Sequence, residues 1–338
     1  MSYELLVEVT RNKVVESRHF GAAVVCDFKG NVLDGWGDIE QLVFPRSALK
    51  PLLAIDIVQS GASEHFALSD AELSLSCASH QGQEIHENKV REWLSRLKLG
   101  PEYLTCGAVL PDDEANAHKL IASGQSGCRL CHNCSGKHAG FLTMALHLNM
   151  PLKDYHLIEH PVQKLALVSL SNMVGIDLRQ YPSGIDGCGF PALSMPLVSL
   201  AHATALFANP EKLSKHRAKA VLRLHEALIR EPYYAAGHST LVSDLNKITK
   251  GAVLAKTGAE GIITAALPEK GIGISLKISD GNARARTVAL LAILDHLEVL
   301  SDIEKEQLHA YIRPQLENSR NLEVGEIRPA QSWLKDSR

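Results

Sequence analysis

The stretch LLVEVTRNKVVESRHFGAAVVCDFKGNVLDGWGD, residues 5–38, decides the fold class. β-Branched and polar residues alternate along it, and a turn at residues 29–31 interrupts it, which predicts two or three antiparallel strands. The stretch AVLAKTGAEGIITAALPEKGIGISLKISDG, residues 252–281, has the same strand character, with a turn at 268–271. We therefore expect one antiparallel sheet built from both ends of the chain.

Helical patterns fill the rest of the chain. Residues 83–98 form a charged amphipathic helix, and helical spacing dominates from about 137 to 230, with loops at 182–191 and 207–212. NARARTVALLAILDHLEVL, residues 282–300, adds a closing helix. A sheet from both ends around a helical middle is an α+β organisation. We interpret the chain as a single domain, 1–338, with a sheet lobe of about 1–60 and 235–330 and a mostly helical lobe of about 61–234.

Composition excludes several classes of partner. The 338 residues are 45% hydrophobic and 22% charged, and a net charge of −3 without blocks of like charge argues against nucleic-acid binding. The start of the chain lacks the pattern of a signal peptide, and the apolar-rich stretch 190–208 is too polar to predict a membrane span. Seven cysteines without an export signal predict reduced thiols and a cytoplasmic location.

The segment FPRSALKPLLA, residues 44–54, places Ser47 three residues before Lys50 at the head of an apolar run. Pro51 is tolerated in a first helical turn, so we expect Ser47 at a helix N-terminus with Lys50 one turn away on the same side. Amides and the helix dipole there can stabilise an oxyanion, while a desolvated lysine accepts the serine proton. The alternative is an N-capping serine followed by a lysine that extends to solvent.

A second pair with the same spacing, Ser95 and Lys98, shows that spacing alone does not identify a catalytic pair. Both residues belong to the charged amphipathic pattern of residues 83–98. We therefore predict that Ser95 and Lys98 lie on a solvated helix face and have no catalytic role.

Two further segments carry side chains suited to serine chemistry. In LSCASHQG, residues 75–82, Ser79 and His80 end an apolar strand-like run; the alternative is an ordinary turn serine. In LAKTGAEGI, residues 254–262, Lys256 precedes a hydroxyl residue and a glycine at the start of a strand; the alternative is a β-turn lysine. Penicillin-recognising serine enzymes combine Ser-x-x-Lys with such a Lys-Ser/Thr-Gly triplet later in the chain, and the order here agrees.

A cysteine-rich segment suggests a metal site without establishing one. CRLCHNCSGKHAGF, residues 128–141, has cysteine spacing similar to half of a zinc site, and no second Cys-x-x-Cys completes it. A site formed by Cys134, Cys188 and one weaker ligand would leave a coordination position open. The alternative is a set of buried, reduced thiols.

Together these segments resemble the Rhizobium-type (class 3) L-asparaginases, the asparaginase II family. The resemblance covers roughly residues 5–325 and rests on five segments in order: PRSALKP, CASHQG, HNCSGKHAGFL, GIDGCGFPA and AKTGAEG. It implies a fold similar to serine β-lactamases and penicillin-binding proteins. It also implies hydrolysis of L-asparagine to L-aspartate and ammonia by a homodimer.

The resemblance assigns expected roles to matching residues. It implies that Ser47 is the nucleophile and Lys50 its base, with Ser79 and Lys256 as a second serine–lysine pair. Because crowded lysines lower one another's pKa, we expect a neutral to alkaline pH optimum. The remaining matches are Arg46, His138 and Asp186 near the bound amino acid, and Cys134, Lys137 and Cys188 as a zinc site. Cys128 and Cys131 are additional cysteines to which no role is assigned.

Two alternative functions share parts of this pattern. A glutaminase or a β-lactam hydrolase would use the same serine and lysine chemistry, and substrate comparison separates them from an asparaginase. A zinc-dependent amino-acid sensor would bind its ligand without releasing ammonia.

Overall fold

The computed structural model describes residues 3–334 of the chain. The chain divides into two compact units. We call them the sheet unit, which consists of Met1–Ala48, Met195–Asn209 and Ile248–Arg338, and the helical unit, which consists of Leu49–Ser194 and Pro210–Lys247. The sheet unit therefore combines sequence from both ends of the chain with one segment from its middle.

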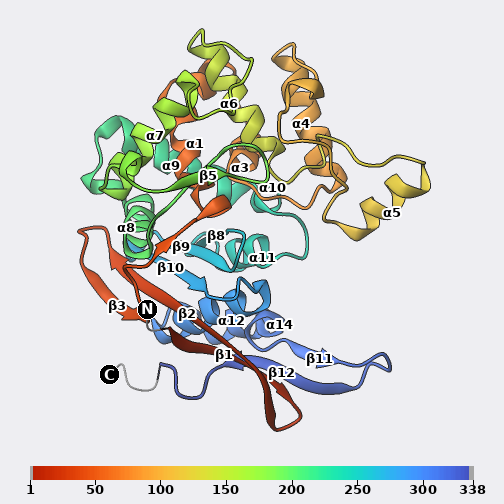
Figure 1. Cartoon of the computed structure of the whole chain (residues 1–338), viewed down its shortest axis with the longest axis vertical. Coiled ribbons are helices and arrows are strands. Elements are labelled where there is room, and N and C mark those ends of the chain that lie inside the picture. The colour runs from red at the N-terminus through yellow and green to blue at the C-terminus, as the bar shows by residue number, and fades with distance from the viewer. Residues whose placement is uncertain (1–2, 335–338) are drawn as a thin grey trace. The chain divides into compact units, whose positions relative to one another are not determined.

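An eight-stranded antiparallel sheet forms the sheet unit (Figure 1). Its strand order is β11-β12-β1-β2-β10-β9-β8, and β3 also pairs with β2. Val24 of β2 lies opposite Ser275 of β10, so this pairing joins strands from the two ends of the chain and confirms the predicted fold class. The strands are β1 (Glu4–Arg11), β2 (Val14–Asp27), β3 (Val32–Trp36), β8 (Leu254–Thr257), β9 (Ile262–Leu267), β10 (Ile272–Ile278), β11 (Gln315–Glu317) and β12 (Glu323–Pro329).

Helices α8 (Leu197–Ala208) and α12 (Ala283–His296) pack against this sheet from opposite faces (Figure 1). Gly273 of β10 approaches α8 so closely that a β-carbon on it would lie 2.2 Å from the backbone nitrogen of Ala205. Ser275 lies on the same face and donates a hydrogen bond of 2.8 Å to the first carbonyl of α8. Only a glycine at position 273 leaves room for this close approach of β10 to α8. The unit is completed by β4 (Leu42–Val43), β7 (Met195–Pro196), α13 (Asp302–Gln307) and α14 (His309–Ile312).

The helical unit is organised around α6 (Ser135–His147). Every residue from Ser135 to Ala145 is buried, as expected of a helix that is surrounded by other elements on all sides. The other helices are α1 (Lys50–Gln59), α2 (Ala62–His65), α3 (Asp70–Ser76), α4 (Glu84–Arg96), α5 (Glu114–Ala122), α7 (Pro161–Val174), α9 (Lys215–Arg230), α10 (Pro232–Ala235) and α11 (Leu241–Ile248). A short hairpin of β5 (Ser183–Ile185) and β6 (Pro191–Leu193) belongs to the same unit.

The helix expected after Ser47 is present but begins later. A 3₁₀ turn, η1 (Arg46–Leu49), precedes α1, which starts at Lys50 with Pro51 in its first turn. Ser47 therefore lies in a 3₁₀ turn, which winds more tightly than an α-helix and has poorer hydrogen-bond geometry. The predicted amphipathic helix is confirmed as α4, and Ser95 and Lys98 are exposed, as their solvated pattern indicated.

The strand-like interpretation of the run before Ser79 is wrong. This run forms α3, which begins at a capping box in which Ser69 accepts from the Glu72 amide and Glu72 accepts from the Ser69 amide. Such a reciprocal cap starts a helix whatever the β-propensity of the residues that follow. A short apolar run alone does not distinguish a buried strand from a buried helix.

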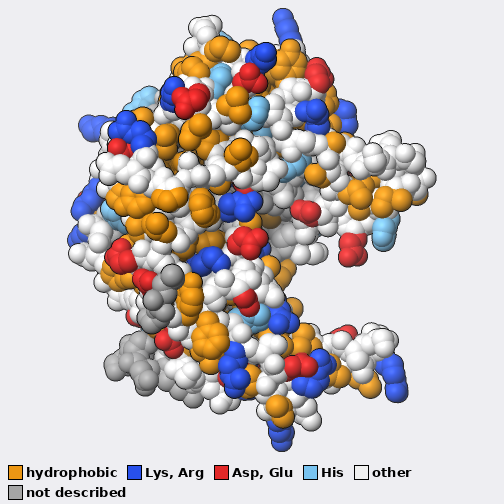
Figure 2. All heavy atoms as spheres, in the orientation of Figure 1, with side chains coloured by type: hydrophobic (Ala, Val, Ile, Leu, Met, Phe, Trp, Pro, Cys, Tyr) orange, Lys and Arg blue, Asp and Glu red, His pale blue; other side chains and the backbone are white. Residues whose placement is uncertain are grey.

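Charges of both signs are interspersed on the face shown in Figure 2. This distribution agrees with the small net charge of −3. Among residues 3–334, no helix combines the length and the apolar character that a membrane crossing requires.

Candidate active site

Lys50, the first residue of α1, is enclosed in the helical unit with 1% of its surface exposed. Its Nζ donates to the Ala78 carbonyl at 2.5 Å, to Ser79 Oγ at 3.1 Å and to the Asn133 carbonyl at 3.2 Å. An ammonium group has three N–H bonds, so these acceptors use all of them. The lysine therefore does not extend to solvent, which was the alternative that the sequence left open.

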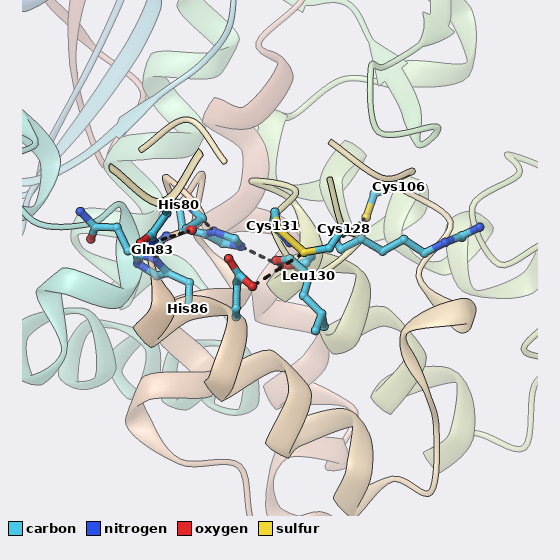
Figure 3. Close-up of a disulfide and its surroundings, with 12 residues drawn as sticks. His80, Gln83, His86, Cys106, Cys128, Leu130 and Cys131 are labelled. Carbon is cyan, nitrogen blue, oxygen red and sulfur yellow. Dashed lines mark hydrogen bonds between the residues drawn. A yellow bond between two sulfur atoms is a disulfide. The ribbon is translucent and has the colours of Figure 1, made fainter. Parts of the chain in front are cut away.

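The segment after α3 carries Ser79 and His80 beside this lysine. His80 is fully buried, and its Nδ1 accepts the Gly82 N–H at 3.1 Å, so the ring proton lies on Nε2 and is donated to Ser135 Oγ at 2.8 Å (Figure 3). Burial lowers the pKa of His80 well below its ordinary value, which keeps the ring neutral. Gly82 has φ +69°, and a β-carbon on it would lie 2.7 Å from the Cys131 carbonyl. This glycine therefore allows the segment to pack tightly on residues 128–135.

Cys134, Lys137 and Cys188 form a buried cluster. Cys134 is the N-cap of α6, Lys137 lies in its first turn, and Cys188 comes from the β5–β6 hairpin. A hydrogen bond from the Cys188 thiol lowers the pKa of Cys134 well below its ordinary value, and the same bond raises the pKa of Cys188. Lys137 Nζ donates to Cys188 Sγ at 3.0 Å. Burial alone would lower the pKa of Lys137, but the two sulfur atoms raise it.

The donor atoms of this cluster fit a zinc ion. Two cysteine sulfurs are the ligands that Zn²⁺ prefers, and three protein ligands leave a fourth position open. Lys137 would have to lose a proton to bind a metal, since the sulfurs here keep it charged. Binding of a divalent cation releases such protons from its ligands.

His138 directly follows Lys137 on α6 and is also fully buried. The backbone N–H of Thr105 donates to the Tyr155 hydroxyl oxygen at 3.3 Å, and that hydroxyl is 2.6 Å from His138 Nδ1. Thr105 Oγ1 lies 3.4 Å from the same nitrogen, so Tyr155 and Thr105 together hold the Nδ1 edge of the ring. Burial lowers the pKa of His138 well below its ordinary value. Among the described residues, Nε2 has no hydrogen-bond partner, so this atom remains available for a ligand.

The β5–β6 hairpin brings Asp186 and Phe190 to the same cluster. Asp186 is half-buried, and its Oδ2 lies 3.7 Å from Cys188 Sγ. The Phe190 ring lies 3.7 Å from Lys137 Nζ and 4.3 Å from the centre of the His138 ring. An aromatic face stabilises the lysine charge where water is excluded.

The sheet unit holds the other predicted residues: Arg46, Ser47 and Lys256. Lys256 is 4% exposed, and its Nζ donates to the Thr257 carbonyl at 2.7 Å. Gly258 lies against the segment that precedes Ser47, because a β-carbon on it would be 2.4 Å from the Pro45 carbonyl. Arg46 adopts a left-handed backbone with φ 53°, which costs a non-glycine residue free energy and is frequent at functional sites.

The structure brings the predicted residues together in two groups. The helical unit gathers Lys50, Ser79, Cys134, Lys137, His138, Asp186 and Cys188, and the sheet unit gathers Arg46, Ser47 and Lys256. Sequence reasoning missed Tyr155, which lies in a loop without a recognisable motif. Sequence reasoning also gave no role to Asn133, whose contribution is a backbone carbonyl and leaves no side-chain signal.

The expectation that all cysteines are reduced is wrong for one pair. Cys128 and Cys131 form a disulfide, and the free cysteines are Cys26, Cys77, Cys106, Cys134 and Cys188. Glu87 lies with this pair in a group whose ligand atoms are within 4.8 Å of one another. Because both sulfurs are bonded to each other, they offer no thiolate to a metal. The pair forms because a two-residue gap lets the sulfur atoms meet within one turn.

The comparisons with known proteins give one family match. A family model described as L-asparaginase II matches residues 7–329. No curated protein matches the chain.

Solved structures of similar fold share little sequence with this chain. A β-lactamase from Mycobacterium bovis is 14% identical, with 86% of this chain and 95% of that chain covered and a TM-score of 0.41. A class C β-lactamase from Rhodobacter sphaeroides is 13% identical, with 82% and 95% covered and a TM-score of 0.42. A protein named Mglu, in its glutamate form, is 13% identical, with 82% and 61% covered and a TM-score of 0.46. At this identity and these TM-scores, the activities of these proteins do not carry over to this chain.

Proposed function

This chain belongs to the L-asparaginase II family, and from that premise we propose that it hydrolyses L-asparagine to L-aspartate and ammonia. The family match covers nearly the whole chain, which supports an amidohydrolase of the asparaginase type. The observation that supports the proposal most strongly is the buried contact between Lys50 Nζ and Ser79 Oγ at 3.1 Å. A lysine is rarely buried so fully unless it has a structural or chemical role.

In the proposed reaction, Ser47 attacks the side-chain amide carbon of asparagine. For this step Lys50 first loses one of the three protons that its hydrogen bonds use. The resulting neutral amine, in a network with Ser79 and Lys256, accepts the serine proton and passes it to the departing ammonia. Water then hydrolyses the β-aspartyl ester, and the same network returns the proton to Ser47. The Ser-x-x-Lys spacing and the family resemblance support these roles for Ser47 and Lys50.

The substrate's other groups are assigned by charge. Asp186 is suited to the α-ammonium group and Arg46 to the α-carboxylate. His138 contributes a neutral ring whose Nε2 has no partner among the described residues, which suits a polar group of the substrate. These contacts would orient the amide for attack and favour asparagine over glutamine.

We also propose a zinc ion at Cys134, Lys137 and Cys188. When bound, it would have a structural role or orient the substrate through one open position for an oxygen ligand, and it would not generate the nucleophile. The thiol–thiolate contact and the buried donor set support this assignment. The cytoplasmic location and the homodimer implied by the resemblance remain predictions.

The first test is ammonia release from L-asparagine by the wild type and by Ser47→Ala. We expect the variant to lose activity by about a thousandfold or more while circular dichroism shows an unchanged fold. Ser95→Ala is the matched control, because Ser95 has the same spacing to a lysine and is exposed. Full activity in a folded Ser47→Ala protein would contradict the assignment of Ser47 as nucleophile.

A substrate comparison tests the specificity. L-Glutamine is one methylene longer than L-asparagine, and a pocket of fixed size discriminates such a difference by about 1–3 kcal/mol. We therefore expect kcat/KM for glutamine to be lower by about 10-fold to 200-fold, and no turnover of a chromogenic β-lactam. Equal rates on both amides would favour a glutaminase, and ligand binding without ammonia release would favour an amino-acid sensor.

A further inference from the structure

The disulfide between Cys128 and Cys131 lies directly before the segment that contains Asn133, whose carbonyl accepts from Lys50, and the proposed zinc ligands Cys134 and Lys137. Figure 3 shows it with His80 and His86 on one side and Cys106 on the other. A Cys-x-x-Cys pair closes a small ring that opens and closes without rearranging distant parts of a chain. Such pairs are suited to thiol–disulfide exchange.

The two sulfur atoms differ in accessibility and in hydrogen bonding. Cys131 is 1% exposed, whereas Cys128 is half-buried and can be reached from solvent. The backbone N–H of Cys131 lies 3.0 Å from Cys128 Sγ, where it would stabilise a thiolate once the disulfide opens. An incoming thiolate can therefore attack the accessible sulfur of Cys128. The buried sulfur of Cys131 is then the one that leaves.

A carboxyl group lies beside the accessible sulfur. Glu87 of α4 places Oε2 3.8 Å from Cys128 Sγ. Burial raises the pKa of Glu87 above its ordinary value, which increases the share of its protonated form. A protonated carboxyl at this distance can deliver a proton to a sulfur that becomes a thiolate.

Backbone contacts connect the disulfide to the candidate active site. The Asn133 carbonyl, two residues after Cys131, accepts from Lys50 Nζ at 3.2 Å. The Leu130 carbonyl accepts from Ser135 Oγ at 3.0 Å, and that hydroxyl is bonded to His80. Opening the disulfide removes a covalent constraint from the segment that makes both contacts.

We propose that Cys128 and Cys131 form a thiol–disulfide exchange site through which a dithiol reductant lowers the activity of the neighbouring lysine–serine site. The activity half of this proposal rests on the proposed function. In the exchange, a reductant thiolate attacks Cys128 Sγ, the sulfur–sulfur bond breaks, and Cys131 leaves as a thiolate that takes a proton from water. The second thiol of the reductant loses its proton to water and attacks the reductant's own sulfur in the mixed disulfide, and Cys128 leaves as Glu87 protonates it. Two electrons and two protons pass to the pair, and the reductant becomes a disulfide.

Thiol trapping tests the exchange site without any assay of activity. Full-length protein isolated without reductant is equilibrated under native conditions with mixtures of reduced and oxidised dithiothreitol, alkylated, and mapped by peptide mass spectrometry. We expect Cys128 and Cys131 to be protected at first, to become alkylated together as the reduced fraction rises, and to re-form the disulfide on reoxidation. Alkylation of both residues from the start, or a disulfide that opens only on unfolding, would overturn the proposal.

The role of Glu87 is tested by the rate of reduction. Glu87→Gln keeps the shape of the side chain and removes its proton, so we expect reduction by dithiothreitol to slow by about tenfold or more. Glu92→Gln, an exposed position of the same helix, is the matched control. An unchanged rate in Glu87→Gln would remove Glu87 from the exchange step.

The effect on activity is measured as kcat/KM for L-asparagine in the two redox states. We expect reduction to lower it by about threefold to thirtyfold, and the Cys128→Ser/Cys131→Ser double variant to stay near the reduced value at every redox poise. An equal kcat/KM in both states would overturn the link to the active site. Absence of ammonia release in both states would instead contradict the proposed function, and the alkylation pattern would still decide the exchange site.

Discussion

At the scale of single residues, Tyr155 holds the ring of His138 in place. Its hydroxyl accepts from the Thr105 amide and lies 2.6 Å from Nδ1, and Nε2 has no partner among the described residues. Tyr155 is thus a positioning residue that acts through His138. A polar network of this kind is effective only when each member has a defined direction.

We predict that Tyr155→Phe raises KM for L-asparagine more than it lowers kcat. Loss of this hydrogen bond frees the orientation of the His138 ring, at a cost of about 1–3 kcal/mol, or about 5-fold to 150-fold in kcat/KM. Steady-state kinetics at several pH values measure this. The exposed Tyr103 supplies the control, Tyr103→Phe. A variant that loses stability but keeps its KM would show that Tyr155 has only a packing role.

Asp56 of α1 provides a second residue-scale prediction. It is 4% exposed, accepts from Ser169 Oγ at 2.5 Å, and has a pKa raised to about 7, chiefly by burial. Because the folded pKa exceeds the ordinary 3.8, the folded state holds a proton that the unfolded state has released between about pH 4 and 7. This group therefore favours folding at low pH and costs up to about 4 kcal/mol of stability as the pH rises through 7.

We expect Asp56→Asn to remove this pH dependence, because the amide keeps an acceptor for Ser169 and does not titrate. The free energy of unfolding by urea, measured at pH 5 and pH 8, checks it. The wild type should lose stability from pH 5 to pH 8, whereas the variant should not lose this contribution. An equal difference from the wild type at both pH values would show that Asp56 is already charged at pH 5.

At the scale of elements, the close approach of β8 to the turn before α1 depends on Gly258. Its position leaves no room for a methyl group beside the Pro45 carbonyl, at 2.4 Å. Packing against Pro45 therefore explains why the third residue of the lysine–threonine–glycine triplet is a glycine. The same glycine adjoins the segment that carries Arg46 and Ser47.

We predict that Gly258→Ala displaces this segment and lowers kcat/KM by about tenfold or more, since a shift of about 1 Å at reacting groups costs that much. Gly184→Ala is the matched control, because a β-carbon there meets nothing within 4 Å. Ammonia release and urea unfolding of both variants separate misplacement from lost stability. Wild-type activity in Gly258→Ala would contradict the need for this approach.

At the scale of the whole molecule, different contacts hold each of the two units together. In the sheet unit, strands from both ends pair around β2 and β10, and α8 joins them although its sequence comes from the middle of the chain. In the helical unit, the buried helix α6 presents Lys137 and His138 on consecutive residues. Long-range pairing therefore decides which segments form the sheet unit.

We predict that Gly273→Ala weakens the attachment of α8 to the sheet. A methyl group 2.2 Å from the Ala205 nitrogen forces the helix away, at a cost of about 1–3 kcal/mol or more. Urea unfolding measures this loss. Gly184→Ala again serves as control, and unchanged stability in Gly273→Ala would mean that α8 shifts without cost.

The sequence by itself determined the antiparallel sheet, the α4 helix and the surface position of Ser95 and Lys98. These features follow from local periodicity, which the chain carries wherever it folds. It also determined the family, because five ordered segments are far more specific than one. It failed for the run before Ser79, since a capping box outweighed an ambiguous apolar pattern.

Only the tertiary structure decided which atoms meet. It placed Ser79 Oγ and the Asn133 carbonyl on Lys50 Nζ, Tyr155 on His138, and Cys188 from a distant hairpin on Lys137. It also set the charges of the cysteine cluster and the burial that shifts their pKa values. Contacts between segments far apart in sequence depend on packing and desolvation of the folded chain. The local spacing of residues predicts neither.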